Sequence, residues 1–249
     1  GTGGSATLRF NTGSTATINT GDTTINVSAR GGTAGGEFIP SGDNAAGGDA
    51  TGGTATIAAL GGTSAQIASL GIDASALSGG AYSDSGTTGR TGDAQGGTIS
   101  IAATGSGSTL TLTSGDMLLD ASGTASSGGR ENAGSGTGGR IGLSATGNGT
   151  IDVAGTVAAD AFGGSTSIST LTSAGSGTGG SIDILADTGG AISAQAYQAR
   201  ANAGVVNTSG NNGAARGGDV SMIARGGGSV ATRSDGVSVL EVRAIDGVS

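Results

Sequence analysis

The sequence predicts an all-β fold: a right-handed parallel β-helix (β-solenoid) of about six coils, with three strands and one long glycine-rich insert in each coil. Three observations predict it. A Gly-Gly pair followed by alternating apolar residues recurs six times. The apolar residues occupy the same columns in each recurrence, and glycine-rich segments of variable length separate the recurrences. Self-similarity of this kind is the signature of a solenoid.

The first strand of each coil follows the Gly-Gly pair, which begins at residues 3, 52, 96, 138, 179 and 217. Alternation with period two marks a strand with one buried face, and identical columns indicate that these strands stack on one another. The three columns are Ala6, Ala55, Ile99, Ile141, Ile182 and Val220; Leu8, Ile57, Ile101, Leu143, Ile184 and Met222; and Phe10, Ala59, Ala103, Ala145, Ala186 and Ala224.

Two further strands are predicted in each coil, the second after turns such as Thr104-Gly105 and Thr146-Gly147. The second strand includes Ile18, Ile67, Leu110 with Leu112, Ile151 with Val153, and Ile192. The third includes Ile25 with Val27, Ile72 with Ala74, Leu119 with Ala121, Val157 with Ala159 and Ala161, Tyr197 with Ala199, and Val242 with Ala244.

A Gly/Ser/Ala-rich insert follows the third strand, for example over residues 123–137 and 163–178. Because the insert always occurs at the same point, stacking should align all inserts along one edge. Residues 1–249 are therefore interpreted as one solenoid segment with repeats at approximately 3–51, 52–95, 96–137, 138–178, 179–216 and 217–249. Neither terminal repeat resembles a polar cap, so we expect partners in the form of further coils of the same chain or head-to-tail copies of it.

Composition excludes several classes of protein. The 249 residues include 56 glycines, one proline, no cysteine and five aromatic residues, so the core must consist of small aliphatic side chains. The glycines do not recur at every third position as collagen requires, and the strict apolar register argues against disorder. The net charge is −8 and the ten arginines are scattered, whereas a nucleic-acid partner requires a basic stripe. No apolar run approaches the roughly 18 residues of a membrane span.

Acidic residues in the inserts make calcium the one candidate cofactor. Carboxylate oxygens are ligands that calcium prefers. However, Gly47-Gly48-Asp49 matches the calcium-binding nonapeptide repeat poorly, and nothing repeats it in tandem, so solvated acidic loops are the favoured interpretation. The candidate ligands are Asp43, Asp49, Asp84, Asp93 and Glu131.

A column of acidic residues near the end of the third strand is the one candidate for catalysis. Asp73, Asp120 and Asp160 form it, while Asn26, Gln198 and Arg243 are expected at the same place in the first, fifth and sixth coils. Glycoside hydrolysis needs paired carboxylates. A hydrogen-bonding role at the strand end is the favoured alternative, and the absence of histidine and lysine removes most general-base and Schiff-base schemes.

Three further motifs have no assigned function. Accidental glycine matches to a dinucleotide fingerprint lack the helix that such a site requires. Threonines at 109–113 and 15–20 resemble ice-binding arrays, but threonine is not repeated from coil to coil and is also a good strand former. Phe38-Ile39-Pro40 either anchors a neighbouring subunit or folds back onto the coil. No catalytic, cofactor-binding or metal-binding residue is therefore assigned.

The pattern Gly-Gly-x-apolar-x-apolar-x-Ala, followed by a glycine turn and a strand ending in Asp-Ala-Ser, resembles large secreted bacterial proteins of the filamentous-haemagglutinin type. The clearest stretches are Gly96 to Ser122 and Gly138 to Ala161. The resemblance covers essentially the whole chain and implies an extracellular or cell-surface β-helix shaft, as in autotransporter-like adhesins. The long inserts depart from the tight coils of a plain shaft, and no functional residue is transferred from the family.

The leading hypothesis is a non-enzymatic structural role. The chain would form a shaft or filament segment of a secreted bacterial adhesin or matrix protein that acts in surface attachment, biofilm or cell–cell contact, with glycans of host or neighbouring cells as further candidate partners. The first alternative is a β-helix enzyme that acts on polysaccharides, for which three or more carboxylates or arginines should converge in one groove. The second is a self-assembling homopolymeric filament.

Overall fold

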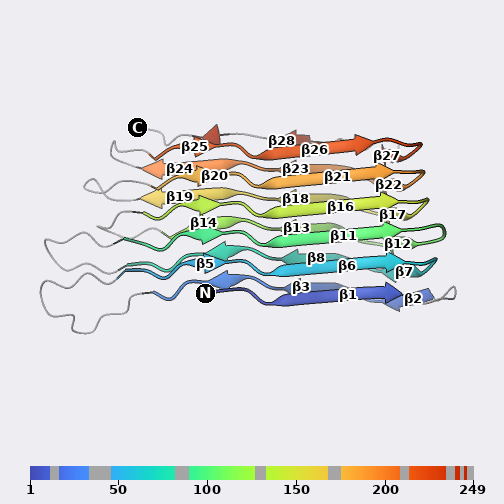
Figure 1. Ribbon diagram of the computed structural model, residues 1–249, viewed down its shortest axis with the longest axis horizontal. Helices are drawn as coiled ribbons and strands as arrows, with labels where there is room; N and C mark the ends of the chain where they lie inside the picture. Colours follow the sequence, from blue (N-terminus) through green and yellow to red (C-terminus); the bar gives the residue numbers. More distant parts are fainter. Residues whose placement is uncertain are drawn as a thin grey trace, which may run out of the picture.

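The computed structural model describes residues 1–11, 17–33, 46–81, 90–126, 133–167, 175–207, 213–233, 239–241 and 244–245. The regular structure of these residues is entirely β-strand. The strands form five parallel sheets that run the length of one stack (Figure 1). The prediction of a parallel β-helix with about six coils is confirmed, but each full coil contributes five strands rather than three.

Sheet 1 contains the long strands that follow the Gly-Gly pairs. Its six strands are β1 (Ser5–Asn11), β6 (Thr54–Leu60), β11 (Thr98–Thr104), β16 (Arg140–Thr146), β21 (Ser181–Asp187) and β26 (Asp219–Ala224). Their register reproduces all three columns read from the sequence: Leu8 pairs with Ile57, Ile57 with Ile101, and so on to Met222.

Sheet 2 follows sheet 1 around each coil. It consists of β2 (Thr17–Thr20), β7 (Ser64–Ile67), β12 (Thr109–Leu112), β17 (Thr150–Val153), β22 (Ala191–Ala194) and β27 (Ser229–Thr232). All the residues predicted for the second strand lie in these strands, from Ile18 in β2 to Ile192 in β22. In the register, Ile18 pairs with Ala65, and Ile67 pairs with Thr20 and Leu112.

Sheet 3 lies behind sheet 1. It consists of β3 (Thr23–Asn26), β8 (Leu70–Asp73), β13 (Met117–Asp120), β18 (Thr156–Asp160), β23 (Ala196–Arg200) and β28 (Val239–Glu241). The prediction that places Val242 and Ala244 in this sheet is wrong for Ala244, which belongs to the next sheet, while Val242 lies outside the described residues.

Sheets 4 and 5 occupy the segments that the sequence assigned to inserts. Sheet 4 consists of β4 (Ala29–Arg30), β9 (Ala76–Leu77), β14 (Gly123–Ala125), β19 (Gly163–Ser167), β24 (Ala203–Asn207) and β29 (Ala244–Ile245). Sheet 5 consists of β5 (Ala50–Thr51), β10 (Ala94–Gln95), β15 (Gly136–Thr137), β20 (Gly177–Thr178) and β25 (Ala215–Arg216).

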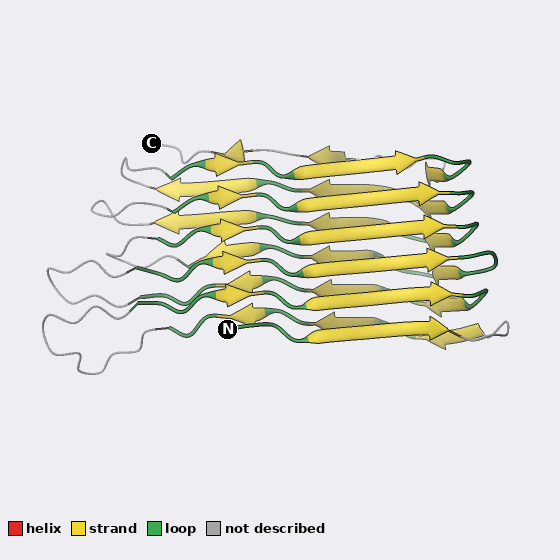
Figure 2. Ribbon diagram, viewed as in Figure 1, coloured by secondary structure: helices red, strands yellow, loops and turns green. Residues whose placement is uncertain are grey.

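The helix is right-handed, as predicted. In Figure 1 the strands of sheet 1 are nearest the viewer and run to the right, and the fainter strands of sheet 3 run to the left behind them. Successive coils rise from the N-terminal end to the C-terminal end. Turns at one side link sheets 1 and 2, and the short strands of sheets 4 and 5 lie at the opposite side, which we call the insert edge (Figure 2).

Sheets 1, 2 and 3 enclose a large compartment filled by stacked aliphatic side chains. In the third coil its interior contains Ile99, Ile101, Leu110, Leu112, Met117 and Leu119, each with at most 2% of its surface exposed. The columns continue through the neighbouring coils and form one hydrophobic core. Aromatic residues contribute little to it: Phe10 and Tyr197 are the buried examples among the described residues.

Sheets 4 and 5 enclose a second, small compartment. Its apolar cluster consists of Ala29, Ala50, Ala76 and Ala94 and is separate from the main core. In the third and fourth coils glycine replaces alanine, and the two sheets approach to backbone contact. A Cβ atom added to Gly123 would lie 2.0 Å from the carbonyl oxygen of Thr137, and one added to Gly163 would lie 1.7 Å from that of Thr178. Only glycine permits this spacing.

The Gly-Gly pairs form a waist between the two compartments. The second glycine donates its N–H to the carbonyl that follows sheet 3 of the preceding coil, as from Gly97 to Ala74 at 2.8 Å and from Gly139 to Ala121 at 2.6 Å. A Cβ on Gly96 would lie 1.8 Å from the Ala121 carbonyl oxygen. The repeated Gly-Gly therefore marks the point where the start of sheet 1 and the end of sheet 3 contact each other through backbone atoms alone.

Candidate functional site

A column of polar residues on the outer face of sheet 3 is the strongest candidate site. The register confirms that Asp73, Asp120 and Asp160 are stacked in successive coils. Two flanking positions differ from the prediction, since Arg200 rather than Gln198 and Glu241 rather than Arg243 complete the column. A two-residue error in the register of the short strands caused both differences. Arg243 itself lies outside the described residues.

The three carboxylates line one shallow groove together with an exposed leucine. Leu118 points outward from β13 with 53% of its surface exposed. Its neighbours in register are Gly71 and Ala158, so small residues leave a hollow on each side of its side chain. This groove was not predicted from the sequence. The signal was present in the run Met117-Leu118-Leu119, in which three apolar residues break the alternation and one of them must face solvent.

Hydrogen bonds explain why the acids stand at the strand ends. Asp73 Oδ1 accepts hydrogen bonds from the Ser75 backbone N–H at 2.9 Å and from Ser75 Oγ at 2.6 Å. Asp120 Oδ1 accepts one from the Ser122 N–H at 2.8 Å. This local turn, in which a side chain binds the backbone two residues ahead, is the strand-end role predicted for the Asp-Ala-Ser motif.

The ends of the column reduce the repulsion among its carboxylates. Asn26 Nδ2 donates to Asp73 Oδ2 at 3.4 Å, and the Arg200 guanidinium lies 3.9 Å from Asp160 Oδ1. Stacked carboxylates would otherwise destabilise each other. The groove thus presents acceptor oxygens beside an apolar side chain, an arrangement suited to hydrogen-bonding a hydroxyl-bearing ligand.

The candidate calcium ligands do not assemble in the described part of the chain. Asp49 and Asp93 lie in successive coils just before sheet 5, where each accepts a hydrogen bond from the coil above: Asp93 N–H to Asp49 Oδ1 at 2.8 Å, and Ser135 N–H to Asp93 Oδ1 at 2.7 Å. Asp93 also pairs with Arg90 at 2.9 Å. Among the described residues no group of three metal-ligating side chains is found. The other candidates, Asp43, Asp84 and Glu131, lie outside those residues.

Hydroxyl side chains follow one column of sheet 2. Thr109 lies in register with Ser64 and Thr150, and its Oγ1 is 2.8 Å from Ser64 Oγ. Threonine is not repeated in every coil, as predicted, and serine fills the position at Ser64 and Ser229. The full column is Thr17, Ser64, Thr109, Thr150, Ala191 and Ser229. The Phe38-Ile39-Pro40 motif lies outside the described residues.

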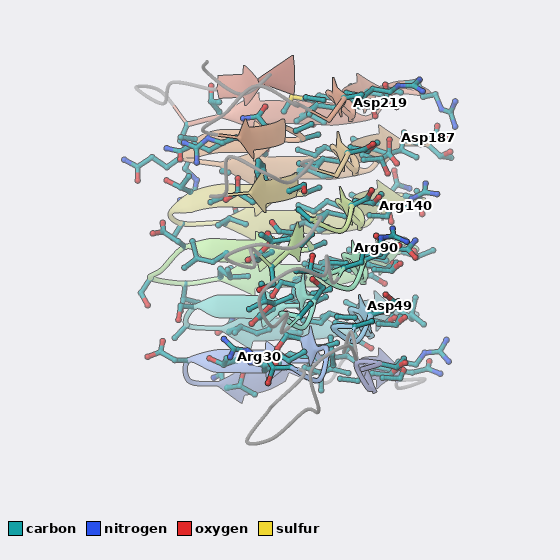
Figure 3. The ribbon with its side chains drawn as sticks, turned by 90° about the vertical axis from the view of Figure 1, so that its left-hand side faces the viewer. Arg30, Asp49, Arg90, Arg140, Asp187 and Asp219 are labelled. Carbon is teal, nitrogen blue, oxygen red and sulfur yellow. The ribbon has the colours of Figure 1, made fainter. Side chains whose placement is uncertain are left out.

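Ion pairs on the outer surface are spread along the stack. Arg140 pairs with Asp183 at 3.1 Å and Arg225 with Asp187 at 2.9 Å, each joining adjacent coils. The hydrogen bond from Arg225 lowers the pKa of Asp187 below its ordinary value. Figure 3 views the molecule from the insert edge, and its labelled residues occur at successive levels of the stack rather than in one cluster.

One buried ionisable group lies in the large compartment. Tyr197 is 1% exposed, and its hydroxyl lies 3.2 Å from the carbonyl oxygens of Ile192 and Ala231. Burial, with a smaller effect of the charge on Asp152, raises the pKa of Tyr197 to about 12. Burial alone would raise the pKa of Asp152, but hydrogen bonds from Ser193 and Arg233 lower it overall.

These features define a right-handed parallel β-helix with a polar outer surface. In the described part of the chain, no helix has the length and apolar character needed to cross a membrane. Comparison with protein-family models, with curated proteins and with solved structures finds no significant match.

Proposed function

We propose that this chain is a segment of the structural shaft of a secreted bacterial adhesin or extracellular matrix protein, as its resemblance to filamentous-haemagglutinin-type proteins implies. The observation that carries the proposal is the uninterrupted register of sheets 1 to 4 through six coils. Such a stack distributes its stability over all neighbouring coils. Its exposed surface carries ion pairs that are spread along the stack, such as Arg140 with Asp183 and Arg225 with Asp187.

A shaft should tolerate changes in length. Residues 96–137 form the third coil, and Gln95 pairs in register with Thr137, so a second copy of 96–137 placed after Thr137 preserves every column. Ten such copies should lengthen the particle by roughly 48 Å, at about 4.8 Å for each coil. Electron microscopy of purified protein measures this, and aggregation or an unchanged length would contradict a shaft.

The cellular role needs a separate test. Antibodies raised against residues 1–249 should label material outside the source cell in immunogold electron microscopy, at a distance from the membrane. Removal of these residues from the gene should reduce attachment to surfaces or to neighbouring cells. Labelling confined to the cell interior would contradict the proposal.

A polysaccharide-active enzyme is the second candidate, because three carboxylates line the groove beside Leu118. Adjacent coils place such groups roughly 5 Å apart, close to the separation used by retaining glycosidases. If this candidate is correct, the chain should release reducing ends from acidic or neutral polysaccharides, and Asp120→Asn should abolish the release while Asp183→Asn, on the other face, leaves it unchanged. No release by the unaltered chain would exclude this candidate for the polysaccharides assayed.

A further inference from the structure

The glycine waist divides each interior coil into two compartments with very different apolar content. In the third coil the large compartment buries six large side chains, whereas the small compartment beside it contains glycine and alanine. Burial of a large aliphatic side chain removes several times more apolar surface from water than burial of a single methyl group, and it stabilises a fold correspondingly more. The apolar contribution to stability is therefore concentrated on one side of the waist.

Backbone hydrogen bonding does not offset this difference. Strands on both sides of the waist bond to the neighbouring coils, as from Ala94 N–H to the Ser135 carbonyl at 2.9 Å in sheet 5 and from Thr109 N–H to the Thr63 carbonyl at 2.8 Å in sheet 2. What differs is the packing beneath those strands. Segments with few buried apolar contacts open with the smallest free energy.

The hydrogen bonds of the waist close the large compartment independently of the small compartment. The hydrogen bonds from Gly97 to Ala74 and from Gly139 to Ala121 join sheet 1 to the end of sheet 3 directly. Opening of sheets 4 and 5 therefore leaves the ring of sheets 1, 2 and 3 connected. At the far end of the small compartment, Gly79 N–H donates to the Gly48 carbonyl at 2.8 Å, which forms a second, thinner closure.

We propose that the small compartment acts as a yielding edge, which opens as a unit while the large compartment stays closed. Sheets 4 and 5 are consecutive in each full coil, as β14 and β15 are in the third coil, so a disturbance at the insert edge acts on the small compartment first. The hydrogen bonds of the waist keep sheets 1, 2 and 3 joined when the small compartment opens. The inference concerns the fold and holds whether or not the chain belongs to an adhesin.

Hydrogen–deuterium exchange of the whole 249-residue chain tests the proposal. Amides of β9, β10, β14 and β15 should exchange at least tenfold faster than those of β7, β11, β12 and β16, although both sets are hydrogen-bonded within interior coils. Equal exchange rates in the two sets would overturn the proposal, because they would show one cooperative unit.

A pair of variants separates the compartments. Ala94→Gly removes a methyl group from the small compartment and should accelerate exchange in sheets 4 and 5 severalfold, with β11 and β12 unchanged. Ile151→Val removes a methylene from the large compartment and should accelerate exchange in sheets 1 and 2 without altering the faster exchange of sheets 4 and 5. If either variant accelerated exchange in both sets of strands, the proposal that the small compartment opens independently of the large one would be refuted.

Discussion

The waist predicts that, of two glycines three residues apart, one tolerates substitution by alanine and the other does not. Gly139 lies in the waist, where an added Cβ would be 2.0 Å from the Gly97 carbonyl oxygen and 2.6 Å from the Gly96 carbonyl carbon. Gly142 lies on the outer face of β16, where the nearest atom to an added Cβ is the Ile99 carbonyl oxygen at 4.0 Å. Neither residue has a positive φ angle, so the comparison isolates the space available for the methyl group.

The cost of Gly139→Ala follows from the bonds that must separate to admit the methyl group. These are the hydrogen bonds from Gly139 to Ala121 at 2.6 Å and from Arg140 to Gly97 at 2.9 Å. A buried backbone group left without a partner costs about 1–3 kcal/mol, so loss of both bonds predicts a destabilisation of about 2–6 kcal/mol. Gly142→Ala should change the free energy of unfolding by no more than about 0.5 kcal/mol.

Urea denaturation followed by circular dichroism measures both variants against the unaltered chain. If Gly139→Ala does not fold, loss of the β-sheet signal under conditions where Gly142→Ala remains folded gives the same answer. Two variants with free energies of unfolding within about 0.5 kcal/mol of each other would refute the waist, because the backbone would then have room for a side chain there.

The remaining predictions concern pH, metal and cross-coil bonds. Because the pKa of Tyr197 is raised to about 12, its contribution to stability is fully present below pH 10 and should fall by about 3 kcal/mol as the pH rises from 10 to 12; Tyr197→Phe should remove this dependence in alkaline melts. The lowered pKa of Asp152 has the opposite sign, so its contribution is lost in acid, and Arg233→Gln should weaken that acid dependence in melts at pH 2 to 5. A chelator should leave the melting temperature unchanged if the acidic loops are merely solvated; a clear decrease would indicate a bound cation. Asp93→Ala should lower the melting temperature more than Asp219→Ala, since Asp93 accepts the Ser135 N–H across coils.

The large compartment was predicted well because its strands alternate large apolar residues with polar ones. Sheet 1 alternates large apolar with polar residues over seven positions in most coils, so its columns were read to the residue. Sheets 2 and 3 have strands of three to five residues, and strands such as β12 and β18 turn only two apolar side chains toward the interior. An alignment by apolar matching can then slip by two residues without penalty, as the expected position of Gln198 did.

Sheets 4 and 5 were not predicted because their inward-facing residues are hardly more apolar than their outward-facing ones. The interior positions are alanine or glycine, as at Ala94, Gly123 and Gly136, and segments rich in such residues are typical of loops. A signal was nevertheless present in the polar residue that precedes each Gly-Gly pair. From the end of the first coil onward, those residues stack in one register: Thr51, Gln95, Thr137, Thr178 and Arg216.

The candidate site was likewise predicted only in part. Its carboxylates were predicted as a column because aspartate repeats visibly at Asp73, Asp120 and Asp160. The groove beside them depends on Gly71 and Ala158 flanking Leu118, which requires the register between coils. The hydrogen-bonding role of the acids was predicted correctly, because a short polar side chain two residues before serine is a local turn motif.

Cysteine cross-linking tests the central claim, in-register stacking of successive coils, most directly. The chain contains no cysteine, so an introduced pair has no background. Thr56 and Ser100 are register partners on the outer face of sheet 1, whereas Thr56 and Ala102 are two residues out of register. A disulfide requires Cα atoms about 4.4–6.8 Å apart, which neighbouring strands satisfy only in register. The account predicts an intramolecular disulfide in Thr56→Cys/Ser100→Cys and little in Thr56→Cys/Ala102→Cys; equal or reversed yields would contradict it.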